Sequence, residues 1–220
     1  MPNRFEIRKF TPDTFYHVFN RGVEKRIIFQ DDQDYAIFLH LLKYFLSPGQ
    51  KDIVHPLVGL QGYRGVRPRP MTTLFGQVEL HCYSLMPNHF HLLLRQVVDN
   101  GVTMLLRKVC GTYAIYFNHR YERVGHLFQG RFKAVLVNDD SYIVHLTRYM
   151  HINPLELGLT RAVLVSYPYS SYAYYLGEKH AVWLKTDFIL NYFKNDPSSY
   201  KNFVEGETNS ENVLGYLTME

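Results

Sequence analysis

Strand-like and helix-like segments alternate along this chain, and none of the strand-like segments is the long apolar run of a buried parallel sheet. One strand, rich in aromatic and β-branched residues, is predicted over residues 14–22. Two more are predicted over 74–84 and 89–96, and a basic, aromatic strand over 127–137. The alternation indicates a compact α+β domain built on an antiparallel sheet.

Helix signals fill the spaces between these strands. An acidic cap predicts a helix over about residues 31–45, and apolar spacing predicts another over about 102–120. A third is predicted over 138–152, and it should stop there because Pro154 disfavours helical geometry in the residue before it. A short helix is expected near 187–193.

The chain divides into a main domain, residues 1–176, and a C-terminal acidic tail with a short helix, 177–220. Within the domain, proline and glycine punctuate residues 47–73, which we interpret as a basic insertion with a short strand around 53–60. The insertion carries three arginines, Arg64, Arg67 and Arg69.

Charge is distributed unevenly. From residue 187 onward there are six acidic and two basic residues, which leaves 22 basic and 14 acidic residues in the rest of the chain. A basic body with an acidic tail suits a polyanionic partner, although charge alone fits any soluble basic protein. Aromatic residues make up 15% of the chain and could stack on unpaired bases or fill the core.

Membrane and export signals are not found in the sequence. No run of about 18 apolar residues occurs, and the first residues lack the apolar stretch of a signal peptide. Two cysteines, Cys82 and Cys110, make no disulfide framework. We therefore expect a cytoplasmic, nucleoid-associated protein with no membrane partner.

Two histidines in the predicted strand 89–96 are the first candidates for chemistry. Alternation along a strand puts His89 and His91 on one face and Phe90 and Leu92 on the other. Two imidazoles at this spacing can converge on one cation, although a lone His-x-His is more often incidental. A zinc site that adds His81 and Cys82 is a minor alternative.

The predicted helix 138–152 carries the second candidate. Tyr142, Leu146 and Tyr149 form one stripe on it, which Asn153 continues. A tyrosine taken alone in such a stripe is more often a core residue, and Asn153 would then cap the helix end.

Three motifs together resemble the single-tyrosine His-hydrophobic-His (HUH) transposases of bacterial insertion sequences, and most closely the REP-associated tyrosine transposases. They are Leu85-Met86-Pro87-Asn88-His89-Phe90-His91, Gln129-Gly130-Arg131-Phe132-Lys133 and Arg148-Tyr149-Met150-His151-Ile152-Asn153-Pro154. The opening strand and the aromatic segment 166–172 also resemble that subfamily. The resemblance covers roughly residues 14–46 and 74–176. It implies a ferredoxin-like or RNA-recognition-like sandwich, with helices on one face of the sheet.

The resemblance also implies roles for individual residues. His89, His91 and Asn153 would hold Mg²⁺ or Mn²⁺, and Tyr149 would attack a DNA phosphate. His145, one turn before Tyr149, is the candidate proton acceptor, ahead of His151. The substrate would be single-stranded DNA beside a hairpin, cut and rejoined by a monomer or a homodimer.

Several basic residues are expected to contact DNA phosphates: Arg131, Lys133 and Arg148, with Arg64, Arg67 and Arg69 as further candidates. Three other functions remain open. The chain could be a DNA-binding protein whose chemistry has lapsed, a sheet-surface RNA-binding module, or a metal hydrolase that activates water.

Overall fold

The structure, a computed structural model, describes residues 9–49 and 72–206. Its strands are β1 (Thr14–Arg21), β2 (Val78–Met86), β3 (His89–Gln96) and β4 (Lys133–Val137). Its longer helices are α1 (Asp32–Leu46), α2 (Gly101–Arg120), α3 (Asp140–Ile152) and α6 (Pro197–Glu205). Its shorter helices are α4 (Tyr172–Tyr175), α5 (Asp187–Leu190) and the 3-10 turns Val23–Lys25, Asn153–Leu157, Arg161–Ser166 and Asn191–Phe193.

The four strands form one sheet in the order β2-β3-β1-β4, and every neighbouring pair is antiparallel. The chain runs β1-α1-β2-β3-α2-β4 through this sheet. That connectivity is the split βαβ arrangement of ferredoxin-like domains. The predicted α+β antiparallel sandwich is confirmed.

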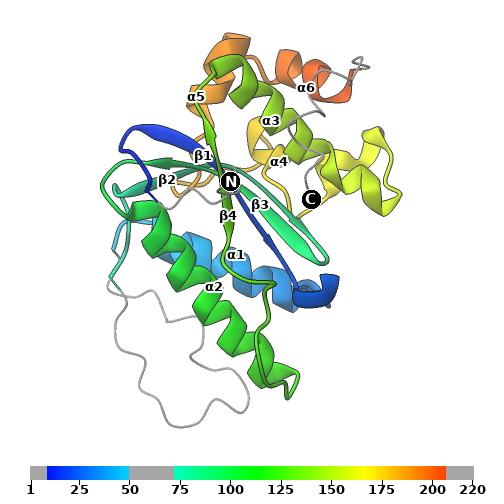
Figure 1. Cartoon of the computed structure of the whole chain (residues 1–220). Coiled ribbons are helices and arrows are strands. Elements are labelled where there is room, and N and C mark those ends of the chain that lie inside the picture. The colour runs from blue at the N-terminus through cyan, green and yellow to red at the C-terminus, as the bar shows by residue number, and fades with distance from the viewer. Residues whose placement is uncertain (1–8, 50–71, 207–220) are drawn as a thin grey trace, which may run out of the picture.

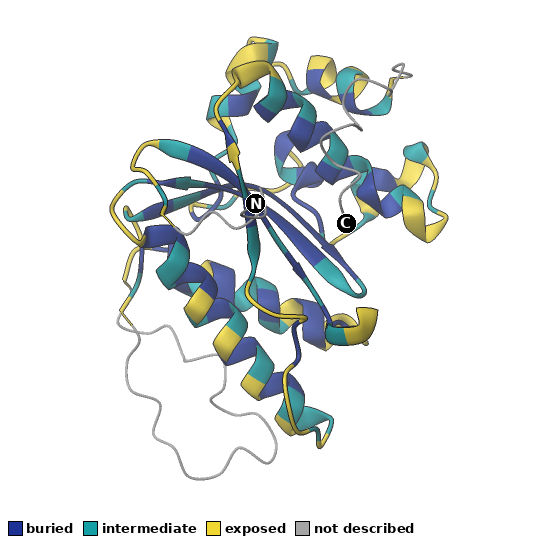
Figure 2. Ribbon diagram, viewed as in Figure 1, coloured by how far each residue is buried: buried dark blue, intermediate teal, exposed yellow. Residues whose placement is uncertain are grey.

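Helices lie on both faces of the sheet (Figure 1). Helices α1 and α2 pack on the face that presents Tyr16, Val18 and Leu92, and these side chains join the larger core. Helix α3 packs on the opposite face, over Phe15 and Leu93. The sequence predicted helices on one face of the sheet. Helices α1 and α2 do share one face, whereas α3 lies on the other. In Figure 2 buried residues run along the strands and recur in the helices on both faces of the sheet.

Helix ends follow the predicted caps. The Asp31 side chain accepts a hydrogen bond from the Asp34 amide at the start of α1, and Asp139 accepts one from Tyr142 at the start of α3. Helix α3 ends at Ile152, and Pro154 lies in the 3-10 turn that follows. The predicted helix end is confirmed.

Two strand boundaries differ from the prediction. Strand β2 begins at Val78, because the three preceding residues form a turn with Gly76 at φ +74°. Strand β4 begins at Lys133, because residues 127–132 form a loop in which Phe128 makes a single bridge to Gly22. The short strand expected around 53–60 lies outside the described residues.

The segment after α4 is packed against the domain as far as Gly206. Leu184 bridges to Leu80 at the edge of β2, and Ile189, Tyr200 and Val204 are fully buried in the core beneath α3. The predicted short helix near 187–193 is confirmed as α5 and the turn after it, whereas α6 is an additional element. Within the described residues, no helix has the length and apolarity needed to cross a membrane.

Candidate active site

His89 and His91 lie on the sheet face that α3 covers. Their ring centroids are 5.0 Å apart, with the planes perpendicular. Between and beyond them Phe90 and Leu92 point into the larger core, as alternation along β3 requires. His91 is fully buried and His89 is half-buried at the end of the strand next to the β2-β3 turn. The predicted pair is on one face.

Hydrogen bonds orient both rings. Nδ1 of His89 lies 2.6 Å from Oδ1 of Asn88, whose side-chain amide donates to the Lys25 carbonyl. An amide oxygen only accepts, so Nδ1 of His89 carries the proton and Nε2 keeps a lone pair. Nδ1 of His91 lies 2.9 Å from Nε2 of His17 on β1.

Burial keeps these imidazoles neutral. It lowers the pKa of His17 to about 3 and, with the nearby charge of Arg21, the pKa of His89 to about 4. The pKa of His91 is well below its usual value, because of burial first and then its neighbours His17 and His89. Neutral imidazole is the form that coordinates a cation.

Tyr149 on α3 faces these histidines. Its ring is half-buried and meets the His91 ring edge-on, with centroids 5.7 Å apart and an interplanar angle of 85°. Leu146 and Met150, on the neighbouring positions of α3, are buried against the sheet. Packing of α3 therefore brings the predicted nucleophile against His91, one of the predicted cation ligands, from which it is far apart in sequence.

Asn153 begins the 3-10 turn after α3, and its amide N–H bonds to the Tyr149 carbonyl. Its side chain is buried, and within the described residues neither of its polar atoms has a hydrogen-bond partner. The same holds for Nε2 of His89 and for Oγ of Ser84, which pairs with His91 across the β2-β3 ladder. Buried polar atoms are normally satisfied, so these nitrogen and oxygen atoms fit a cation with its water.

No cluster of three or more histidine, cysteine, aspartate or glutamate side chains suited to a metal occurs in the part of the chain that the structure describes. The predicted ligand set instead combines two histidines with the amide of Asn153. Such a mixed set, with positions left for water and phosphate oxygens, suits Mg²⁺ or Mn²⁺ better than a closed zinc site.

Basic side chains lie beside the histidines. Lys133, at the start of β4, has its ammonium 5.8 Å from the centre of the Phe19 ring, which in turn lies 5.9 Å from the His91 ring. Arg131 is exposed in the loop before β4. Arg64, Arg67 and Arg69 lie outside the described residues.

Sequence reasoning missed two residues of this face, His17 and Arg21. Both lie on β1, where His17, Phe19 and Arg21 alternate toward α3. Arg21 pairs with His89 in the β1-β3 ladder, and its Nε–H donates to Gln129 at 2.5 Å. The same alternation that singled out His89 and His91 could have found them.

Arg148 has a different place from the one predicted. Its side chain is buried, and its guanidinium donates to the carbonyls of Phe203 and Gly206 at 2.8 and 2.6 Å. Burial also lowers its pKa. Arg148 thus holds the end of α6 against α3, and we correct its predicted role as a phosphate contact. His145 lies nearby, half-buried and edge-on to Phe203.

The alternative zinc site is not supported by the surroundings of Cys82. The thiol is fully buried and contacts Nε2 of His151 and Oγ of Ser171. Burial raises the pKa of this thiol to about 12, and its contacts belong to the interior between α3 and α4. His151 is bonded in this interior and does not face Tyr149 as a base.

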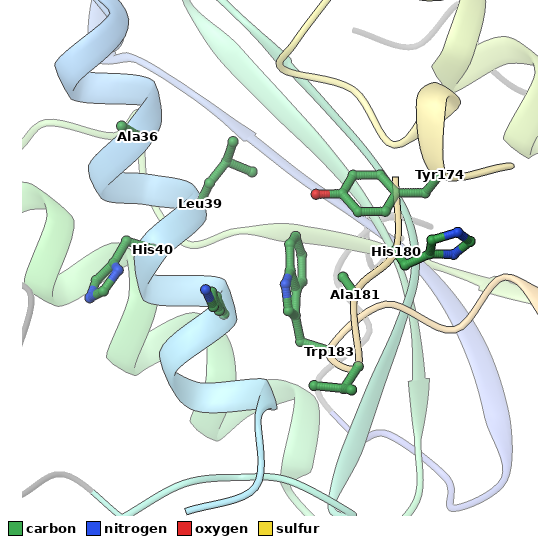
Figure 3. Close-up of a pocket in the computed structure, with 9 residues that line it drawn as sticks. Ala36, Leu39, His40, Tyr174, His180, Ala181 and Trp183 are labelled. Carbon is green, nitrogen blue, oxygen red and sulfur yellow. The ribbon is translucent and has the colours of Figure 1, made fainter. Parts of the chain in front are cut away.

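A pocket of about 490 Å³ lies elsewhere, between α1 and the segment after α4 (Figure 3). Its lining includes Leu39 and Lys43 of α1 and, across from them, Tyr174 and Trp183. None of the predicted site residues that the structure describes lines it. The candidate active site instead lies between α3 and the sheet, around His89, His91 and Tyr149.

Comparison with known proteins gives one family match and one similar solved structure. Residues 74–153 match the family model described as IS200-like transposases, a span that contains both histidines, Tyr149 and Asn153. Among solved structures, a REP-associated tyrosine transposase bound to a REP hairpin has a TM-score of 0.52, with 14% sequence identity. That match covers 86% of this chain and 93% of the other, and it shows the fold. No curated protein matches the chain. The resemblance that the motifs indicate is confirmed.

Proposed function

We propose that this chain, which shares its central segment with the IS200-like transposases and its fold with a REP-associated tyrosine transposase, is a transposase that cleaves and rejoins single-stranded DNA through Tyr149. The single observation that carries the proposal is the position of the Tyr149 ring against His91. A half-buried tyrosine edge-on to a neutral histidine of the sheet fits a nucleophile beside the proposed cation ligands.

In the proposed reaction, the Tyr149 hydroxyl attacks the phosphorus of a DNA phosphodiester. The bond from the tyrosine oxygen to phosphorus forms as the bond to the 3′ oxygen breaks. The products are a 5′-phosphotyrosine link and a 3′-hydroxyl, which has gained a proton. The tyrosine proton passes to a base, for which His145, one turn earlier on α3, is our candidate. Attack by a 3′-hydroxyl on the phosphotyrosine reverses the steps and rejoins DNA.

His89, His91 and Asn153 would hold Mg²⁺ or Mn²⁺. The neutral imidazoles of both histidines, together with the unsatisfied buried atoms of His89 and Asn153 among the described residues, support this assignment. The chemistry that such a cation supplies is neutralisation of charge on the scissile phosphate. Asn88 and His17 orient the two rings through their Nδ1 atoms. Lys133 and Arg131 would contact flanking phosphates, which the nearness of Lys133 to Phe19 and the exposure of Arg131 support.

The substrate we propose is unpaired DNA next to a hairpin. The solved REP-associated transposase is described as bound to a REP hairpin, and this chain shares its fold. An enzyme that acts on an unpaired strand also avoids the cost of opening a duplex.

The test is an incubation of the protein with hairpin-bearing single-stranded DNA and Mn²⁺, followed by a denaturing gel. We expect a covalent protein–DNA band from the wild type and none from Tyr149→Phe, which loses only the nucleophilic hydroxyl and should still bind DNA. Tyr142→Phe, a half-buried tyrosine on the same helix, is the matched control and should form the band.

Other outcomes would point elsewhere. Cleavage by Tyr149→Phe would favour a metal hydrolase that activates water. A wild type that binds DNA without forming the band would favour a lapsed DNA-binding protein, and preference for unpaired RNA would favour the RNA-binding module.

A further inference from the structure

His151 lies two residues after Tyr149 on α3, which turns it about 200° round the helix. Tyr149 faces the sheet histidines, whereas His151 is completely buried on another side of the helix. The reaction proposed above makes no use of this imidazole. Around it lie residues from three other parts of the chain: β2, the start of α4, and α6.

Both nitrogens of the His151 ring are hydrogen-bonded. Nε2 lies 2.8 Å from Oγ of Ser171, at the start of α4, and 3.2 Å from Sγ of Cys82 on β2. Nδ1 lies 2.8 Å from the hydroxyl of Tyr200 on α6. All four side chains have no exposed surface.

One assignment of protons pairs His151 with both Tyr200 and Ser171. The Thr147 hydroxyl donates to the Val144 carbonyl at 2.7 Å, and the Tyr200 hydroxyl donates to Thr147 at 3.0 Å. Nδ1–H of His151 then donates to the Tyr200 oxygen, and Ser171 donates to Nε2. A network in which every buried group is paired favours one arrangement over its neighbours, because any shift leaves a polar group unpaired.

The network joins α3 to the sheet and to the C-terminal helix at once. Ser171 also accepts from the Tyr83 amide, so the Nε2 side is tied to the β2 backbone. On the Nδ1 side, His151 bonds to Tyr200 on α6. Arg148, also on α3, donates to the carbonyls of Phe203 and Gly206 at the end of the same helix. A helix held on two sides can neither slide nor roll freely over the sheet.

We propose that His151 is the positioning residue for Tyr149: by bonding α3 to β2 and to α6, it sets where the Tyr149 hydroxyl stands relative to His89 and His91. This inference rests on the proposed function. The buried network would then affect the reaction by fixing the position of Tyr149, without touching DNA. A displacement of the nucleophile by about 1 Å can slow a reaction about a hundredfold.

The experiment compares His151→Phe, which keeps a ring of similar size and removes both hydrogen bonds, with His151→Gln, which keeps one amide donor and acceptor. His119→Ala, on α2 across the sheet, is the control. For each protein we would measure the single-turnover rate of covalent adduct formation at saturating DNA and Mn²⁺. We would also measure the affinity of each protein for DNA without Mn²⁺, and the hydrogen exchange of its α3 amides.

We expect His151→Phe to form the adduct about tenfold more slowly or worse, with DNA affinity within about threefold of the wild type. His151→Gln should recover part of the rate. Exchange should rise over residues 140–152 and stay unchanged in α2. Since His151→Phe could fail to fold, Tyr200→Phe provides a second test: it removes one hydroxyl on α6 and should slow the same step.

A folded His151→Phe with the wild-type rate would overturn the inference, as would equal losses of rate and DNA affinity, which mark a general loss of structure. A wild type that forms no adduct would instead contradict the proposed function. The two failures are therefore distinguishable.

Discussion

His151 and His89, two of the 11 histidines of this chain, differ in what their ring nitrogens contact. His151 has both nitrogens bonded within the protein, so it serves packing and orientation. His89 has its Nδ1 bonded to Asn88, while Nε2 is buried without a partner among the described residues. The number of ring nitrogens bonded within the protein therefore separates a structural imidazole from a candidate cation ligand.

Lys133 and Arg148 provide a matched test of which basic residues contact DNA. Lys133→Ala should weaken binding to single-stranded DNA and reduce the slope of log affinity against log salt by about 0.7, because one phosphate contact is lost. Arg148→Ala should leave that slope unchanged. It should lower the free energy of unfolding by about 1.5–3 kcal/mol, because the charged donor to Phe203 and Gly206 is removed.

Titrations of labelled single-stranded DNA at several salt concentrations, together with urea unfolding of both variants, would measure these effects. If Arg148→Ala lowers the salt slope and Lys133→Ala does not, the two assignments must be exchanged.

At the level of elements, an acidic cluster ties the start of α1 to the end of α2. Asp34 is completely buried and accepts from Arg120, Tyr116 and Tyr121 at 2.7–2.9 Å. Asp31 caps α1 and also binds Arg120, but its side chain is about half exposed. The two carboxylates belong to one network and differ in their burial.

Burial decides how much each carboxylate contributes to stability. Asp34→Ala leaves several part-buried or buried donors without their acceptor, and we expect the free energy of unfolding to fall by about 3 kcal/mol or more. Asp31→Ala loses a helix cap and a partly exposed ion pair, and should cost about 1 kcal/mol. Urea denaturation of both variants checks the order, and a larger loss from Asp31→Ala would contradict it.

Two acidic residues of the C-terminal segment, Asp196 and Glu205, make hydrogen bonds within the fold. Asp196 caps α6 by accepting from the amides of Ser198 and Ser199, and Glu205 accepts from the Tyr172 hydroxyl. Ending the chain before these residues would remove buried Tyr200 as well. An effect of such a truncation on DNA binding could not be ascribed to charge alone.

For the molecule as a whole, the candidate cation site joins two layers. His89 and His91 belong to the sheet, and Asn153 continues the α3 layer. A cation held by all three should therefore stabilise the packing of α3 on the sheet. At a Mn²⁺ concentration of about 100 times Kd, the gain would be about 2.7 kcal/mol, or a rise in Tm of about 5–10 °C.

His89→Ala and His91→Ala should each abolish this rise and the cleavage of DNA, because too few ligands remain. Asn153→Ala should keep part of both at high Mn²⁺, since water can replace an amide oxygen. Melting curves with Mn²⁺ and with a chelator would measure the rise. Equal rises in the wild type and all three variants would place the cation elsewhere.

Sequence alone determined the features that depend on neighbours along the chain. Alternation placed His89 and His91 on one face, carboxylates capped α1 and α3, and Pro154 ended the last helical turn. Each of these follows from backbone geometry and hydrogen bonds within a few residues, so the printed order of residues suffices.

Only the tertiary structure decided which distant side chains meet. It placed His17 against His91 and turned Arg148 away from solvent toward the carbonyls of α6. It also enclosed His151 among β2, α4 and α6. A helical residue's neighbours depend on which elements pack on each side of the helix, and α6 gave no signal that it would cover α3. Burial then assigned the roles: a buried cation must find acceptors, and a buried imidazole bonded on both sides can only hold its helix in place.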